Sequence, residues 1–74
     1  MDDREIILSK HATDAALDLD LDPDDVFKVV RTGERIHGGR AKARCVLRTK
    51  RGIIVAICGE YPDLIEVITV TKGR

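Results

Sequence analysis

The chain of 74 residues is long enough for one compact domain and too short for two. Hydrophobic residues make up 43% and charged residues 35%, a balance typical of a folded protein and not of a disordered one. With one Phe, one Tyr and no Trp, the composition argues against a nucleic-acid surface built on aromatic stacking. We therefore expect a single globular domain over residues 1–74.

Nothing in the sequence predicts export or a membrane anchor. The chain starts with Met1-Asp2-Asp3, which is acidic where a signal peptide needs basic residues. The longest apolar run, residues 53–58, is far shorter than the roughly 20 residues that span a bilayer. The two cysteines form no CxxC motif. We expect a cytoplasmic protein without a membrane partner.

Charge is divided unevenly along a chain whose formal net charge is zero. Residues 1–30 carry nine acids and three bases, a balance of −6, whereas residues 31–74 carry ten bases and four acids, a balance of +6. Six of the sixteen residues in 37–52 are Lys or Arg, and none is acidic. This asymmetry favours a basic surface for a polyanion, docking on an acidic protein, or head-to-tail self-association.

The first elements predicted are a short extended segment over 4–9 and a helix over 10–19, with Ser9 as its N-cap. Small apolar residues recur along this helix at i, i+3, i+4 and i+7, which makes a narrow stripe suited to close packing on a sheet. The stripe consists of Ala12, Ala15, Ala16 and Leu19.

A second helix is predicted to begin at Asp22, a good N-cap, with Pro23 at the first helical position. Leu21 and Val26 are placed to form a hydrophobic staple. Gly33 is expected to stop the helix. The buried face should come from Val26, Phe27, Val29 and Val30.

The hydrophobic period changes from 3.6 to 2 after Gly38-Gly39, which predicts three consecutive strands over 42–50, 53–58 and 64–71. The order of two helices followed by a meander indicates an α+β domain. We expect two N-terminal helices packed on one face of a three- to four-stranded antiparallel sheet.

The turn at residues 50–52 decides which side chains share a face. A two-residue turn would need positive φ at Arg51 and would place Cys45 and Cys58 on one face. A three-residue turn with Gly52 in the left-handed region avoids that strain and buries Ile53, Val55 and Ile57. The second alternative is preferred, and it predicts two free thiols on opposite faces of the sheet.

Alternation along the first of these strands places its basic residues on the face away from the helices, about 7 Å apart when they are nearest same-face neighbours. Two interpretations stay open: a binding surface for a polyanion, or a solvated face that keeps the strand soluble. The residues are Lys42, Arg44, Arg48 and Lys50.

No metal or cofactor is predicted. The segment DLDLDPDD resembles a calcium loop, but Pro23 stands where that loop needs glycine and Val29 where it needs a bidentate Glu. His11 and His37 lie far apart and have no paired cysteines nearby. His11, at the second position of the first helix, is either a surface residue or a neutral general base acting on a phosphate ester.

Several short stretches together resemble a prokaryotic family of short domains of unknown function. They are LSKHA (8–12), LDPDDVFKVVRTGE (21–34), a basic strand, a glycine turn, IIVAI (53–57) and VITV (67–70). That family is grouped with the barnase, EndoU, colicin and RelE-like ribonuclease-toxin fold. The resemblance implies helices on one side of an antiparallel sheet and an open face where related toxins bind and cut RNA.

The resemblance also implies site residues. His11 matches the histidine of the family and Thr69 the threonine of its last strand, whereas Ala15, Leu19 and Thr71 stand where the family often has Arg, Arg and Tyr. The implied catalytic set is His11, Arg44, Arg48 and Thr69. The implied nucleic-acid contacts are Arg40, Lys42, Lys50, Arg51 and Lys72.

Two classes of function follow. The first is an RNA-binding protein or metal-independent endoribonuclease, with His11 as acid or base and Arg44 and Arg48 stabilising the phosphate. The second is a non-catalytic interaction module. Its basic face would dock on an acidic, antitoxin-like partner or on another copy of the chain.

Overall fold

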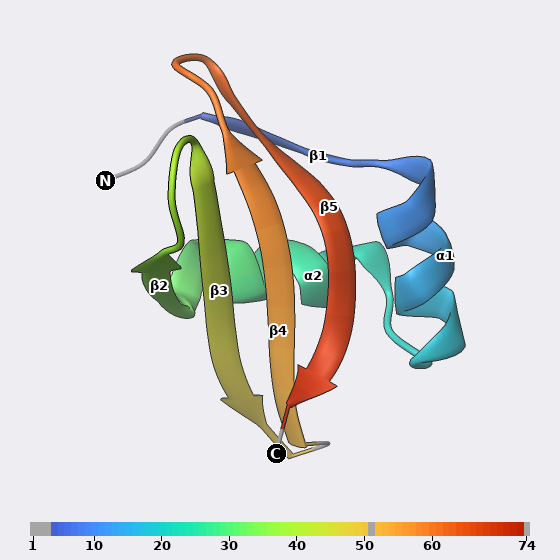
Figure 1. Cartoon of the computed structure of the whole chain (residues 1–74). Helices are drawn as coiled ribbons and strands as arrows, with labels where there is room; N and C mark the ends of the chain where they lie inside the picture. The colour runs from blue at the N-terminus through green and yellow to red at the C-terminus, as the bar shows by residue number, and fades with distance from the viewer. Residues whose placement is uncertain (1–3, 51, 74) are drawn as a thin grey trace.

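The computed structural model describes residues 4–50 and 52–73, which fold into two helices and one sheet (Figure 1). The elements are β1 (Glu5–Leu8), α1 (Lys10–Asp18), α2 (Pro23–Thr32), β2 (Glu34–His37), β3 (Lys42–Thr49), β4 (Gly52–Glu60) and β5 (Leu64–Gly73). The strand order is β1-β5-β4-β3-β2. Figure 1 shows α2 crossing behind the sheet and α1 beside β5.

The α+β class is confirmed, but the predicted sheet of three to four antiparallel strands is wrong. The sheet has five strands and is mixed, because β1 runs parallel to β5. Residues 34–37, which the sequence did not mark as a strand, pair antiparallel with β3. Helices α1 and α2 carry the chain from β1 at one edge of the sheet to β2 at the other, so the two edges come from segments before and after the helices.

The first helix begins as its sequence predicts. Ser9 is extended, and its Oγ accepts a hydrogen bond from the backbone N–H of Ala12 at 3.0 Å. Such a cap typically contributes about 1 kcal/mol. Ala12 and Ala16 are fully buried against the sheet, where side chains without bulk allow the helix to lie close to β5. Of the predicted stripe, Ala12 and Ala16 form the buried contact face and Leu19 packs partly against the core, whereas Ala15 is only partly buried and lies outside the core cluster.

The second helix also has the predicted start. Asp22 is its N-cap, Pro23 occupies the first turn, and the backbone N–H of Asp22 donates to Asp25 Oδ2 at 3.0 Å. The carboxylates of the first turn complement the positive end of the helix dipole. The buried face of α2 comes from Val26, Val29 and Val30, whereas Phe27, which was also predicted for this face, is only partly buried.

Gly33 ends α2 at the predicted position, but its role there is steric. Its φ is −74°, so no left-handed conformation is involved. A Cβ at this position would lie 2.5 Å from the Val29 carbonyl oxygen and 2.6 Å from the Val46 carbonyl oxygen. Glycine therefore allows the end of α2 to pass directly against β3 before the chain enters β2.

The turn predicted at residues 50–52, which joins β3 to β4, is wrong. Thr49 pairs with Gly52, so the loop contains only residues 50 and 51. Gly52, at φ 115°, takes the positive φ, and Arg51 lies outside the described residues. Cys45 therefore pairs with Ala56 and Ala43 with Cys58, which puts both cysteines on the same, helix-bearing face.

The packing of the helices explains this register. The inner faces of β3 and β4, which α2 contacts, carry the small residues Ala43, Cys45, Ala56 and Cys58 beside Leu47 and Ile54. The other large aliphatics of β4 point outward. The buried cluster contains Ala12, Ala16, Leu21, Val26, Val29, Val30, Cys45, Ile54, Ala56, Cys58, Ile65, Val67 and Val70. A thin, closely packed core is favoured over one that buries Ile53, Val55 and Ile57.

Candidate functional site

The face of the sheet away from the helices, here called the outer face, carries a row of bases along β3. Lys42, Arg44 and Arg48 alternate with the buried Ala43 and Cys45 and are all exposed. Among the described residues, none forms an ion pair with these three side chains. The row is therefore a line of positive charge without ion pairs in the described residues, with Glu34 of β2 as a neighbouring acid opposite Val46.

Strand register brings Arg44 into line with Thr69. Arg44 pairs with Ile57 on β4, and Ile57 pairs with Thr69 on β5, so the three side chains form one row across the outer face. Two strand spacings separate Arg44 from Thr69 by roughly 9–10 Å. Ile36 of β2 extends the row on the other side of Arg44.

The rest of the outer face is mainly aliphatic. Ile53, Val55 and Ile57 of β4 are each partly exposed beside the basic row. At one end, a Cβ on Gly59 would lie 3.4 Å from Tyr61 Cε2 and 3.7 Å from Ile68 Cδ1, so both side chains lie over that glycine. Tyr61 is 47% exposed and is an aromatic group that sequence reasoning did not assign to this face.

His11 is held in a different layer from the arginines. It is exposed on α1, whose Ala12 and Ala16 pack on the inner face, whereas Arg44 and Arg48 project from the outer face. The N-terminus of α1 is nevertheless tied to β5, because Ser9 Oγ donates to the carbonyl of Ile68, the neighbour of Thr69. The structure thus aligns Arg44 with Thr69 and leaves His11 on the other layer.

The remaining predicted nucleic-acid contacts do not share one surface. Arg40 is exposed in the loop between β2 and β3. Lys72 pairs with Ile54 and so lies on the helix-bearing side of the sheet, although it is exposed. Arg51 is outside the residues that the structure describes.

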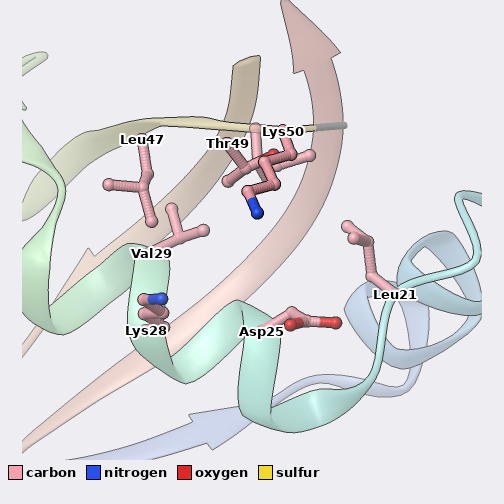
Figure 2. A pocket seen from close by; sticks show the side chains of 8 residues that line it. Leu21, Asp25, Lys28, Val29, Leu47, Thr49 and Lys50 are labelled. Atoms are coloured by element: carbon pink, nitrogen blue, oxygen red, sulfur yellow. The ribbon is translucent and has the colours of Figure 1, made fainter. Parts of the chain in front are cut away.

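Lys50 was predicted to join the outer row, and this placement is wrong. It belongs to the turn after β3 and lines a cavity of about 200 Å³ between α2 and the sheet (Figure 2). The cavity is lined by Leu21, Asp25, Lys28, Val29, Leu47, Thr49, Lys50 and Ile54. Its volume is below the roughly 300–1,000 Å³ typical of small-molecule sites.

A polar cluster that sequence reasoning missed lies on the inner face, around Glu60. Its carboxylate oxygen Oε1 is 3.2 Å from both Arg4 Nη2 and Arg35 Nη1, and its Oε2 is 3.3 Å from His37 Nδ1. The Glu60 side chain is only 14% exposed. Arg4 also donates from Nη1 to the Tyr61 carbonyl at 3.1 Å, which connects the N-terminal edge of the sheet to the β4–β5 turn.

The two cysteines lie next to this cluster and interact with each other. Both are buried free thiols, 1% and 0% exposed. A hydrogen bond with Cys58 lowers the pKa of Cys45 from 9.0 to about 6, against the effect of burial and with support from the Arg35 guanidinium. The same bond, together with burial, raises the pKa of Cys58 well above its ordinary value. The pair therefore favours one shared negative charge.

The signal for this cluster was present in the alternation of β4. Once Ile54, Ala56 and Cys58 face inward, Glu60 must follow them to the inner face. The three-residue turn predicted at residues 50–52 had instead placed Glu60 on the outer face. Arg35 and His37 lie in β2, which had not been predicted as a strand.

The described part of the chain contains neither a group of potential metal ligands nor a membrane-crossing helix. In residues 4–50 and 52–73, no three His, Cys, Asp or Glu side chains are grouped closely enough to hold a metal ion. Neither α1, with nine residues, nor α2, with ten, has the length and apolar character of a membrane-crossing helix. Comparisons with protein-family models, with curated proteins and with solved structures found no match for this chain.

Proposed function

We propose that the outer face of the sheet binds single-stranded RNA, chiefly through its phosphates. The observation that supports this is the row formed by Lys42, Arg44 and Arg48, which is exposed and has no ion-pair partner among the described residues. Phosphate contacts supply affinity with little base preference. The two arginines can each bind a phosphate through two parallel N–H···O bonds, which lysine cannot.

Tyr61 gives this surface one stacking group at the Lys42 end. Lys42 pairs with Gly59, and the Tyr61 ring covers that glycine. Stacking of one base on an aromatic ring is worth about 1–3 kcal/mol. The proposed order along the face is therefore a stacked base at Tyr61, followed by phosphates at Lys42, Arg44 and Arg48.

Binding without cleavage is the form of the proposal that the geometry supports best. The arrangement of helices on one face and an open opposite face is compatible with a relationship to the RelE/barnase-like ribonucleases in the cytoplasm, which we also propose. However, His11 lies on the helix layer, and Ala15, Leu19 and Thr71 cannot supply the guanidinium and phenol groups expected in that family. A general base must reach the proton that it abstracts.

The test is a salt titration of labelled single-stranded RNA with the intact chain and with the double variant Arg44→Ala/Arg48→Ala. We expect weaker binding to every RNA sequence and a log–log salt slope reduced by about 1.4, because each phosphate contact on a single strand contributes about 0.7. His11→Ala should leave binding unchanged. An assay in EDTA should detect no cleavage by the parent chain.

The matched control removes a base from the other side of the molecule. Arg31 is exposed in the last turn of α2, so Arg31→Ala removes one positive charge, as the single variant Arg44→Ala does, without touching the outer face. Equal weakening by Arg31→Ala and by Arg44→Ala would mean that the RNA responds to total charge and not to the row. No binding above background at about 50 mM salt would end the RNA proposal.

A second candidate is supported by the aliphatic residues of the outer face. A partly exposed stripe beside the bases consists of Ile53, Val55 and Ile57. Aliphatic side chains offer a phosphate neither charge nor hydrogen-bond donors, so RNA binding does not explain this stripe. An acidic amphipathic segment of a protein partner, or the acidic helices of another copy, would cover both features. Val55→Ser should weaken docking of an acidic amphipathic peptide and leave RNA binding unaffected.

A further inference from the structure

Cys45 and Cys58 are the only cysteines of the chain, and the fold places them together on neighbouring strands beside an arginine. We propose that this pair is an oxidation site at which peroxide converts two buried thiols into a reversible β3–β4 disulfide, with Cys45 reacting first. The site is independent of RNA binding, because it lies on the opposite face of the sheet from the basic row.

Strand register carries the first part of the proposal. Cys45 pairs with Ala56 and Cys58 with Ala43, so the cysteines occupy diagonal positions on one face. The two thiols are close enough to shift each other's pKa in opposite directions. Diagonal neighbours have Cα atoms about 7–8 Å apart, whereas a disulfide needs less than about 7 Å. A movement of about 1 Å therefore separates the dithiol from the disulfide.

The strand irregularity at Cys58 provides room for that movement. Ile57 pairs with Thr69 and Cys58 with Val67, so Ile68 of β5 is an extra residue opposite the Ile57–Cys58 step of β4. The bulge interrupts the β5 ladder beside Cys58, so β4 is held less regularly there than along its pairing with β3. The small movement can therefore be absorbed next to Cys58 without disturbing the pairing of Cys45 with Ala56.

The environment of Cys45 favours it as the first thiol to react. The Arg35 guanidinium hydrogen-bonds Cys45 and is held in place by Glu60 at 3.2 Å. A thiolate is the form that peroxide oxidises, and an adjacent guanidinium stabilises it. The Cys58 thiol donates to the Ala56 carbonyl at 3.9 Å and keeps its proton beside Cys45, so it is the resolving partner.

Access for a small oxidant comes from the edge of the sheet. Cys45 is covered on one side by β2, a strand of four residues that includes Arg35, its direct partner. His37, also on β2, has a side chain that is 72% exposed. Short edge strands open locally at low cost compared with global unfolding. Opening of β2 would expose Cys45, whereas Cys58 lies one strand deeper.

Hydrogen peroxide is the only co-reactant that this oxidation needs. The Cys45 thiolate attacks one peroxide oxygen, the O–O bond breaks, and a sulfenic acid and hydroxide are formed. The Cys58 thiol then attacks the sulfenic sulfur, an S–S bond forms, and water leaves with the Cys58 proton. Two thiols lose two electrons and two protons, and hydrogen peroxide becomes two waters. A dithiol reductant reverses the change by exchange.

The experiment treats the folded chain with hydrogen peroxide, blocks remaining thiols in denaturant with an alkylating reagent, and measures the mass of the monomer. We expect both thiols to disappear together, with a mass decrease of two hydrogens that dithiothreitol reverses. Retention of both thiols while free cysteine in the same tube is oxidised would overturn the proposal. So would a disulfide that joins two chains.

Single variants test the order of the reaction. In Cys58→Ser, Cys45 should form a sulfenic acid that dimedone traps. In Cys45→Ser, Cys58 should be oxidised at least about tenfold more slowly. Equal rates would refute the assignment of Cys45 as the first thiol. Alanine replacements serve where serine prevents folding, as judged by circular dichroism, and the measurement on the parent chain needs no variant.

Discussion

Arg35 connects the Glu60 carboxylate to the Cys45 thiol: its Nη1 lies 3.2 Å from Glu60 Oε1, and the same guanidinium hydrogen-bonds the thiol. It also donates from Nη2 to the Val30 carbonyl at the end of α2, at 3.5 Å. One side chain on a short edge strand thus joins the helix terminus, a carboxylate and the dithiol.

The dithiol should make stability depend on pH. The pKa of Cys45 is lowered from 9.0 to about 6, so its stabilising contribution is absent below pH 6 and grows as pH rises towards 9. The pKa of Cys58 is raised, so its contribution is present below pH 9 and is lost above it, where the unfolded thiol ionises. The two contributions together are largest near pH 9.

The measurement is urea unfolding across this pH range for the parent chain under reducing conditions and for Cys45→Ala/Cys58→Ala. Subtracting the two curves removes the titration of all other groups. The difference should rise between pH 6 and 9 and fall above pH 9. A difference that does not change with pH would show that the thiols titrate alike in the folded and unfolded states.

Removing the carboxylate of Glu60 should destabilise the fold. Glu60→Ala leaves Arg4 and Arg35 without their shared partner in a site where the Glu60 side chain is 14% exposed. We expect a loss of about 1–2 kcal/mol, between the values for exposed and buried ion pairs. Glu34→Ala is the control, because Glu34 is exposed on the same sheet and should change stability by less than about 0.5 kcal/mol.

Replacing Gly33 should be costly for a steric reason. Gly33→Ala would force a Cβ to within 2.5 Å of one carbonyl oxygen and 2.6 Å of another, both on the backbone. The end of α2 would have to move away from β3, at a cost of about 1–3 kcal/mol by analogy with overpacked cores. Gly38→Ala, which meets nothing within 4 Å, is the matched control. Chemical denaturation that ranks the two variants equally would contradict this account.

Enlarging the contact face of α1 should also destabilise the domain. Ala16 is 2% exposed against the sheet, so Ala16→Leu adds three carbons where no space exists. The expected loss is about 1–3 kcal/mol. Leu17, the next residue, is 66% exposed, and Leu17→Ala should be close to neutral in the same thermal or urea unfolding experiment.

Local sequence signals were sufficient for the helices. The caps at Ser9 and Asp22, the proline at 23 and the alanine stripe each act within one or two helical turns, so their effects can be read from neighbouring residues. The sheet was predicted less well. The parallel pairing of β1 with β5 joins residues about sixty positions apart, and no local pattern reports such a contact.

The polar cluster around Glu60 was not predicted because the turn at residues 50–52 was expected to be one residue longer than it is. The preference for burying Ile53, Val55 and Ile57 treated a larger side chain as the better core residue. The helices instead present alanine and valine to the sheet, and small side chains such as Cys45 and Ala56 fit that separation. Because strand side chains alternate, a single-residue shift moved Cys58 and Glu60 to the wrong face. The basic row on β3 was predictable because its own alternation did not depend on the turn.

The pairing of β1 with β5 has a consequence for the chain as it leaves the ribosome. β1 is made first, yet the inner-face partners of Ile6 and Leu8, which are Ile65 and Val67, are made about sixty residues later. Ala12 and Ala16 of α1 face the same late strand. During translation, the apolar side chains of β1 and α1 therefore stay exposed to solvent until β5 has been synthesised. This part of the nascent chain is exposed to chaperones and proteases until β5 emerges, because β1 and α1 pack chiefly against that strand.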